Sequence, residues 1–389
     1  CFVDCVGCAR DLHLSLRRQR QIGIRDSRYT VSCPKTACTS NFFGPLTHCI
    51  PFRASRKILS LVLAVFTASL ISASVNAPLI VAAILQRKPL PIRYVAVNKE
   101  PQAKLSTIKD NLATCSVDGD RGLGIITTPK AMDIAIEKAK TYGISMVTIK
   151  NSRHLGMASY HAIQAMKHKM IGMCVTSCPP QVLPTFGAEP LLGTNPIAIA
   201  APAGKKPPYV FDAAMSTIAA NKVSISRRLG NNLLPGWISD NDGAPIMEEF
   251  NPEEYKVNGE NYLLPLGSTR ELGSHKGFGL AGMVDILGGI LSGGGYGANP
   301  GRPNFGHMVT AYNIDSFTDY NEYTKTMDEW LDMLENRKTI PGKDKVIYPG
   351  LPEHITQIER TENGIPVHNE VLDWFEKINK ELKVSNRIN

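Results

Sequence analysis

Residues 144–176 read ISMVTIKNSRHLGMASYHAIQAMKHKMIGMCVT, and this stretch decides the fold class. The apolar run Ile144–Ile149 predicts a buried strand. The stretch Met157–Lys167, rich in small residues, predicts a helix, and Met170–Thr176 predicts a second buried strand. This alternation of strands and helices predicts an α/β protein built in layers.

Segments on both sides continue the alternation. Upstream, Thr127 and Pro129 mark a helix start, because threonine caps a helix and proline suits its first turn, and Gly143 ends that helix. The other predicted elements are strands Thr114–Val117, Ile197–Ala201 and Pro208–Asp212, and helices Ser216–Val223, Gly277–Leu291, Asp319–Asn336 and Pro366–Val384. A polar insertion reaching to about Gly273 separates two of these helices.

His154 is the first candidate site residue. It lies in the polar loop between strand Ile144–Ile149 and helix Met157–Lys167. A neutral imidazole at the end of a rigid strand is well placed to exchange a proton with a bound substrate. Since most single histidines serve packing or capping, a structural role is the alternative to catalysis.

Two further polar clusters, Gly-Thr-Asn-Pro at 193–196 and Ser-His-Lys-Gly at 274–277, interrupt apolar segments. Residues 119–124 and 293–297 are glycine-rich, but neither lies in the strand–turn–helix context of a dinucleotide-binding fingerprint. A doubly wound dinucleotide fold is therefore not expected, and a nicotinamide cofactor needs another binding site.

Asp212–Ser216 is one candidate for that site. It follows a predicted strand and is expected to begin a helix, where backbone N–H groups attract phosphate. The alternative is simple capping of the helix by the aspartate or the serine.

His275–Gly277 is the other candidate, again at a predicted helix start. Lys276 supplies a positive charge, and Gly277 lets the backbone approach a ligand closely. A solvated helix start is the alternative. In the earlier cluster, Asn195 precedes Pro196, a position more typical of a turn residue than of a ligand.

Charge and cysteine content separate the first 57 residues from the rest of the 389-residue chain. Residues 1–57 hold ten of the 43 basic side chains and three of the 35 acidic ones, so the remainder is nearly neutral. This distribution argues against nucleic-acid binding. Six of the nine cysteines precede residue 50, and the other three predict a protein of a reducing compartment, the cytoplasm. No metal site is expected, although Cys1, Cys5 and Cys8 have the spacing of iron–sulfur ligands.

Residues 1–88 form an N-terminal extension that is unreliable for functional inference. Within it, the 28 residues Ile58–Leu85 carry no charge and are long enough to span a bilayer. The alternatives are the apolar part of a signal peptide, with residues 75–77 as its cleavage site, and two buried helical pieces separated by Pro78. Membrane contact is expected only if this segment belongs to the native protein.

Taken together, the clusters resemble the non-Rossmann family of malate/L-lactate dehydrogenases, which also contains ureidoglycolate, sulfolactate and Δ1-piperideine-2-carboxylate oxidoreductases. The resemblance runs in order from about residue 93 to 384. The matching stretches are 117–119, 122–124, 151–156, 193–198, 212–216, 275–280, 348–350 and 364–366.

The resemblance implies an α/β fold of the non-Rossmann malate/L-lactate dehydrogenase type, with a separate cofactor-binding domain and helical termini. The implied division assigns 89–130 and 280–389 to a main, substrate and dimerisation region and 131–279 to the cofactor. A homodimer is implied as well.

For activity, the resemblance implies hydride transfer between NAD or NADP and a small 2-hydroxy acid, malate or lactate first. His154 is the implied proton acceptor, and donor in the reverse direction. The implied cofactor contacts are Cys178, Asn195, Asp212, Ala213, Ala214, His275, Lys276 and Gly277. Position 178 is commonly serine in the family, so the thiol of Cys178 weakens that hydrogen bond.

One departure concerns the substrate carboxylate. The family carries a Ser-His-Gly motif and then an arginine near the N-terminus, and aligning Tyr94 and Val95 with that segment puts Leu90 at the arginine's position. Losing a charged contact to the carboxylate costs about 1.5–3 kcal/mol. Arg93 and Arg153 are the candidate replacements. A catalytically impaired cofactor-binding homologue and a cyclic imine reductase of this family are therefore the alternatives.

Overall fold

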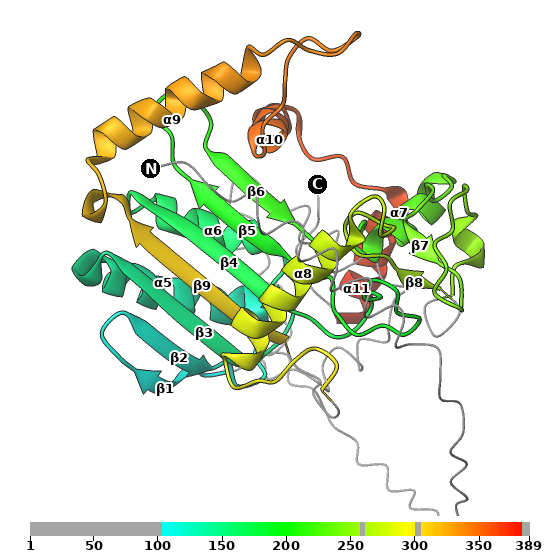
Figure 1. The fold of residues 1–389 in the computed structure, drawn as a ribbon, viewed down its shortest axis with the longest axis horizontal. Coiled ribbons are helices and arrows are strands. Elements are labelled where there is room, and N and C mark those ends of the chain that lie inside the picture. Colours follow the sequence, from blue (N-terminus) through cyan, green and yellow to red (C-terminus); the bar gives the residue numbers. More distant parts are fainter. Residues whose placement is uncertain (1–102, 257–260, 300–304, 383–389) are drawn as a thin grey trace, which may run out of the picture. The chain divides into compact units, whose positions relative to one another are not determined.

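The computed structural model describes residues 103–256, 261–299 and 305–382, and its centre is a seven-stranded sheet (Figure 1). The strand order is β1-β2-β3-β9-β4-β5-β6. These strands are β1 Ser106–Asp110, β2 Thr114–Asp118, β3 Ile144–Ser152, β4 Met170–Ser177, β5 Ile197–Ala201, β6 Tyr209–Ala213 and β9 Phe305–Asn313. A small second sheet pairs β7 (Ile238–Ser239) with β8 (Tyr262–Leu263).

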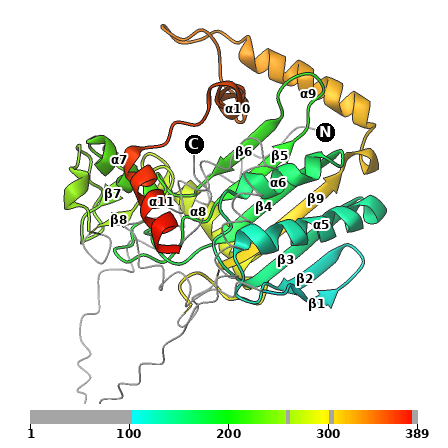
Figure 2. The same ribbon diagram turned by 180° about the vertical axis from the view of Figure 1, so that it is seen from behind.

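Helices cover both faces of the large sheet. Figure 2 shows α5 and α6 over one face, and Figure 1 shows α8 over the other. The helices are α5 Gly124–Tyr142, α6 Ala158–Met166, α7 Asn221–Leu229, α8 Ser274–Val284, α9 Tyr320–Glu335, α10 Leu351–Asn363 and α11 Asn369–Leu382. Short 3₁₀ turns lie at Pro252–Glu254 and Ile314–Ser316, and α8 continues as a π-helix over Asp285–Ile290.

The direction of β9 determines where the loops of the sheet meet. β9 pairs antiparallel with both β3 and β4, so those two strands run parallel to each other. Phe305 lies opposite Ser152 of β3, and Gly306 lies opposite Ser177 of β4. The carboxyl ends of β3 and β4 therefore reach the same edge of the sheet, and the loops that follow them begin side by side.

Small residues let the helices approach the sheet closely. The main core contains six buried alanines of α5 and α6, which are Ala131, Ala135, Ala139, Ala158, Ala162 and Ala165. Gly172 of β4 lies so close to α6 that an added Cβ would be 2.0 Å from the carbonyl oxygen of Ala162. Only glycine fits at this contact, because protein interiors leave no room for an extra methyl group.

The α/β class predicted from the sequence is confirmed, and most predicted elements are present. Strand Ile197–Ala201 has the predicted bounds, and the helix expected from Thr127 begins one turn earlier, at Gly124. The predicted helix Ser216–Val223 is wrong in position: α7 begins at Asn221 and runs to Leu229. β1, β9 and α10 are not among the predicted elements.

The sheet draws strands from both predicted regions, since β9 of the region 280–389 lies between two strands of the region 131–279. The assignment of these regions to substrate and cofactor stays a prediction. The extension 1–88, with its apolar segment 58–85, lies outside the described residues. In the part of the chain that is described, every helix is too short or too polar to cross a bilayer.

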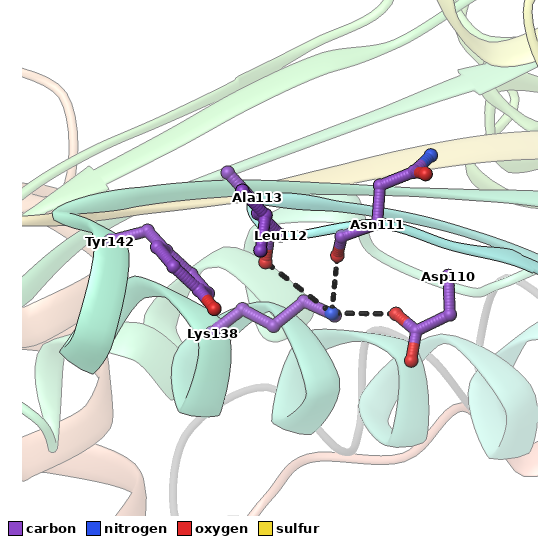
Figure 3. Close-up of a pocket in the computed structure, with 6 residues that line it drawn as sticks. All are labelled: Asp110, Asn111, Leu112, Ala113, Lys138 and Tyr142. Carbon is purple, nitrogen blue, oxygen red and sulfur yellow. Dashed lines mark hydrogen bonds and ion pairs between the residues drawn. The ribbon is translucent and has the colours of Figure 1, made fainter.

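A surface pocket lies at the β1–β2 turn, at the start of β2 and so at the end of the sheet away from the β3 and β4 carboxyl ends (Figure 3). Its centre is Lys138 of α5, whose Nζ is 2.6 Å from Asp110 Oδ1 and 2.7 Å from the Asn111 carbonyl oxygen. The hydrogen bond to Asp110 raises the pKa of Lys138. These contacts tie the hairpin to the helix, and we assign this pocket no part in the chemistry.

Replacing Gly172 with alanine tests the close contact between β4 and α6. The added methyl group would overlap the Ala162 carbonyl, so Gly172→Ala is expected to lower the free energy of unfolding in urea by about 1–3 kcal/mol. Gly282→Ala in α8 is the control, because an added Cβ there meets nothing within 4 Å and alanine favours a helix. Equal stability of the two variants would contradict this packing.

Candidate active site

His154 lies in the loop between β3 and α6, with its ring exposed to solvent. Its Nδ1 accepts a hydrogen bond from the Gly156 N–H at 2.9 Å, and the ring edge meets Phe305 with centroids 5.6 Å apart. Gly156 has φ 84°, a conformation that suits glycine and turns its N–H back toward the ring. With Nδ1 as the acceptor, the proton of the neutral ring is on Nε2.

Three elements hold the backbone of this loop. The carbonyl of Arg153 is 3.1 Å from His307 Nε2 of β9, and the carbonyl of Leu155 is 3.0 Å from His161 Nε2 of α6. Gly124, the first residue of α5, packs against the same backbone, where an added Cβ would be 2.3 Å from the Arg153 oxygen. The loop is therefore fixed by packing and by two side-chain hydrogen bonds.

His161 is fully buried beneath the loop. Burial lowers the pKa of His161 to about 4, and the hydrogen bond to the Leu155 carbonyl acts in the opposite direction. The ring is therefore neutral at physiological pH, and its Nδ1 has no hydrogen-bond partner among the residues that the structure describes. Tyr160 packs edge-on against it, with ring centroids 5.2 Å apart.

Arg153 is a buried cation next to His154, with 6% of its surface exposed. Its Nη1 donates to the Ser152 carbonyl at 3.4 Å. Burial lowers the pKa of Arg153, and the nearby positive charge of Arg121 adds to this effect. Two arginines thus lie within electrostatic reach of each other beside the His154 loop.

Cys178 and Asn195 meet at the carboxyl end of β4. Asn195 Oδ1 accepts the Cys178 N–H at 2.9 Å, and Asn195 Nδ2 donates to the Ala281 carbonyl of α8 at 2.9 Å. The buried thiol of Cys178 donates to the Thr176 carbonyl at 3.5 Å. Asn195, with φ 38°, therefore ties β4, its own loop and α8 together, as the turn interpretation of this residue suggests.

Asp212 lies at the end of β6 and caps a helix far away in the sequence. Its Oδ2 accepts the Ser159 N–H at 2.7 Å, in the first turn of α6. The predicted helix start at Asp212–Ser216 is wrong, because the chain stays extended there and α7 begins at Asn221. Although the residue keeps exposed surface, burial of its carboxyl group raises the pKa of Asp212, and the Ser159 donor opposes that effect.

His275, Lys276 and Gly277 occupy the first turn of α8, as predicted from the sequence. The side chains of His275 and Lys276 are exposed. Gly277 packs on Leu266, and a Cβ added to Gly277 would be 2.3 Å from the Leu266 carbonyl oxygen. Arg270 donates to His275 Nδ1 at 2.9 Å. Sequence reasoning missed Arg270, because a single cation in a polar insertion carries no signal of its own.

The π-helix after α8 is a second feature that the sequence did not reveal. It begins at Asp285, whose carboxylate accepts from Ser177 Oγ of β4 and, at 3.5 Å, from the Gly297 N–H. Gly289 packs against the Ser177 hydroxyl. Single π turns occur often at functional sites, and this one lies against the β4 end that carries Cys178.

These contacts join the predicted site residues into one continuous cluster. Met215, which follows Asp212–Ala214, donates to the Thr194 carbonyl and accepts from the Leu266 N–H. Leu266 in turn packs on Gly277, and Asn195 contacts α8 at Ala281. The Asp212–Ser159 bond and the His307 contacts connect the His154 loop to the same cluster. Among the described residues, no group of three His, Cys, Asp or Glu side chains is placed to hold a metal ion.

Comparison with known proteins identifies related chains. Residues 92–376 match the malate/L-lactate dehydrogenase family. The malate dehydrogenase of Pyrococcus abyssi is 38% identical over 294 residues, which cover 74% of this chain and 79% of that protein. The L-sulfolactate dehydrogenase of Methanocaldococcus jannaschii is 32% identical over 292 residues, covering 73% of this chain and 80% of that protein.

A solved structure agrees with these matches. The crystal structure of malate dehydrogenase from Entamoeba histolytica superposes with a TM-score of 0.75 at 30% sequence identity. The match covers 86% of this chain and 97% of that one. The likeness therefore extends over nearly the whole of that protein.

The buried ring of His161 makes stability depend on pH. Because the folded-state pKa of about 4 lies below the ordinary value near 6.5, the unfolded chain binds more protons between these values. The stabilising contribution is present above pH 6.5 and is lost as the pH falls toward 4. Relative to His161→Gln, the wild type is expected to lose about 3 kcal/mol over this range. Urea unfolding at a series of pH values measures this loss, and His168→Gln, at an exposed histidine, is the control. If the free energies of unfolding of the wild type and His161→Gln changed in parallel with pH, this expectation would be contradicted.

Proposed function

The chain belongs to the malate/L-lactate dehydrogenase family, and on this premise we propose that it oxidises a small 2-hydroxy acid, with His154 as the proton acceptor. Members of this family are oxidoreductases that act on CH–OH groups and use NAD or NADP. The observation that carries the proposal is the exposed imidazole of His154 on a fixed loop, at the sheet edge where Cys178, Asp212 and the start of α8 are joined.

The proton step follows from the ring geometry. In the described state, the Gly156 N–H occupies Nδ1 and leaves the proton of the neutral ring on Nε2. To accept a proton at Nε2, the ring must carry its own proton on Nδ1, and it must therefore turn away from the Gly156 N–H. His154 then holds the hydroxyl proton of the substrate and returns it to the 2-oxo oxygen in the reverse direction. General base catalysis of this kind contributes about 10²–10⁴-fold to the rate.

The start of α8 fits a dinucleotide phosphate. Arg270, His275 and Lys276 place exposed basic groups at the positive end of an 11-residue helix. An added Cβ at Gly279 meets nothing within 4 Å, so a ligand can lie close to the helix backbone there. When bound, NAD or NADP supplies the hydride acceptor at the nicotinamide C4.

The remaining predicted cofactor contacts surround this helix start, and their roles are limited by the bonds they already make. Asn195 uses its oxygen and one N–H internally, and Asp212 uses one carboxylate oxygen at α6. We therefore assign Cys178, Asn195 and Asp212–Ala214 to the wall of the cofactor site and His275–Gly277 to the phosphates.

Arg153, with Arg121 beside it, is our candidate for the substrate carboxylate; the other candidate from the sequence, Arg93, lies outside the described residues. Each raises the free energy of the other's charge, and an anion between them would relieve that repulsion. Two neighbouring cations favour a substrate with two anionic groups. We therefore place malate, or a 2-hydroxy acid with a second acidic group, before lactate.

The alternatives differ in measurable activity. A cofactor-binding homologue without turnover would bind a nicotinamide nucleotide in calorimetry but oxidise no 2-hydroxy acid. A cyclic imine reductase would reduce cyclic imino acids and not oxaloacetate or pyruvate. Assays of this panel with NAD(H) and NADP(H) separate the three functions. We also infer a homodimer in the cytoplasm, and light scattering tests the oligomeric state.

His154→Ala is expected to lower kcat at least about 100-fold while the Kd for the nicotinamide cofactor changes little, because only the proton acceptor is lost. Steady-state kinetics and calorimetry measure the two effects. The matched control is His168→Ala, an exposed histidine near the other end of α6, which should retain full activity. Full turnover by His154→Ala would eliminate the proposed role.

A further inference from the structure

The peptide carbonyls on both sides of His154 receive hydrogen bonds from histidine rings of two other elements. His307 Nε2 of β9 is 3.1 Å from the Arg153 carbonyl oxygen, and His161 Nε2 of α6 is 3.0 Å from the Leu155 carbonyl oxygen. A carbonyl oxygen only accepts, so both rings donate from Nε2. Each ring is therefore protonated on Nε2.

Both rings are completely buried, so neither of them touches a substrate. Within the described part of the chain, the Nδ1 of His161 meets no hydrogen-bond partner, which is unfavourable in an apolar environment. An apolar side chain of similar size would fill the same space without that penalty. Among the described residues, the His161 side chain makes one hydrogen bond, to the Leu155 carbonyl. This bond is what a histidine provides at this position and a leucine would not.

His307 also reaches the neighbouring strand. Its Nδ1 is 3.1 Å from Thr176 Oγ1 of β4, and the hydroxyl donates because Nε2 carries the ring proton. The thiol of Cys178 donates to the carbonyl of the same threonine. Since β9 lies between β3 and β4 (Figure 1), His307 connects the His154 loop with the β4 end that faces α8.

We propose that His161 and His307 are positioning residues, which set the place of His154 relative to the cofactor side of the site by holding the Arg153 and Leu155 carbonyls. The inference rests on the proposed function of His154. It predicts an effect on the chemical step, because displacement of a reacting group by about 1 Å costs on the order of 100-fold in rate.

The experiment compares His161→Leu and His307→Leu with His161→Gln and His307→Gln, whose amide N–H replaces the Nε2 donor. Both leucine variants should lower kcat about 10–100-fold, with the KM for the 2-hydroxy acid and the cofactor Kd changed less than about threefold. The glutamine variants should recover most of the rate.

Thr176→Val, which removes the hydroxyl that fixes the His307 tautomer, should lower kcat by a smaller factor. Its control is Thr128→Val, because the buried Thr128 hydroxyl makes no hydrogen bond in the described ranges 103–256, 261–299 and 305–382.

The outcomes separate this inference from the proposed function. Suppose that His154→Ala loses turnover while both leucine variants keep the kcat of the wild type. This result would overturn the positioning role and leave the proposed function of His154 intact. Full activity of His154→Ala would overturn the proposed function, and the inference with it. A parallel loss of kcat and cofactor affinity that glutamine does not restore would indicate a merely structural role. Nitrogen-15 NMR of the wild type gives a readout that needs no variant to fold: both rings should be Nε2–H tautomers, and Nδ1–H tautomers would overturn the geometry.

Discussion

The antiparallel pairing of β9 with both β3 and β4 is the constraint on which the site depends. It makes β3 and β4, which α6 connects in the sequence, run parallel, and their carboxyl ends reach one edge. The loop with His154 and the turn with Cys178 start there. The same strand supplies His307, whose two ring nitrogens contact the residues that leave β3 and β4. Without β9, these two loops would have no common support.

Polar side chains at this edge are hydrogen-bonded to the backbone of other elements. Asn195 uses both ends of its amide for backbone partners, and Asp212 accepts from the first turn of α6, which has no side-chain cap of its own. Buried polar groups are stabilising only when they are hydrogen-bonded. These bonds cross between elements far apart in the sequence, so they also fix the relative positions of the strand ends. The edge is therefore a rigid frame, and the exposed groups on it are the ones available for chemistry.

Local signals explain which parts of the fold were predictable. Apolar runs such as Ile144–Ile149 and Ile197–Ala201 identified strands, and Gly143 identified a helix end, because these patterns depend on neighbouring residues. β9 was missed although 308–311 is a buried run, since a short apolar run does not reveal its partners. Ser216 suggested a helix cap, but its hydroxyl donates to the Ile218 carbonyl and its backbone bridges Pro265, so the helix starts later.

In the site, too, residues marked by local patterns were predicted, and contacts between distant segments were not. His154 and the α8 start were found from the order of elements and from the family motifs. Asp212 does cap a helix, which was one of the alternatives considered for it. However, the backbone N–H that it caps belongs to Ser159 of α6, 53 residues earlier in the chain. His307 was not found, because it contacts Arg153, which lies 154 residues away in the sequence. His161 and Arg270 were not found either, although each contacts a residue only six or five positions away, because their side-chain directions carry no signal in the sequence. The sequence thus indicated the exposed His154 and the α8 start, together with the buried Cys178 and Asn195, but not the two buried histidines that hold the His154 loop.

The backbone of the His154 loop is fixed, whereas the His154 ring can turn. The proposed chemistry needs a fixed loop and a mobile ring. The backbone at His154 is held by two imidazole Nε2–H donors and by the packing of Gly124, whereas the ring is held at Nδ1 by the Gly156 N–H. A change of proton on the ring therefore requires a turn about its side-chain bonds and no movement of the loop. An uncharged His161 suits this arrangement, because a positive charge on that ring would disfavour the protonated form of His154. The low pKa of His161 keeps that ring uncharged through the range in which an ordinary histidine titrates. The support can thus stay constant while the proton moves, which is what a residue that both accepts and returns a proton requires.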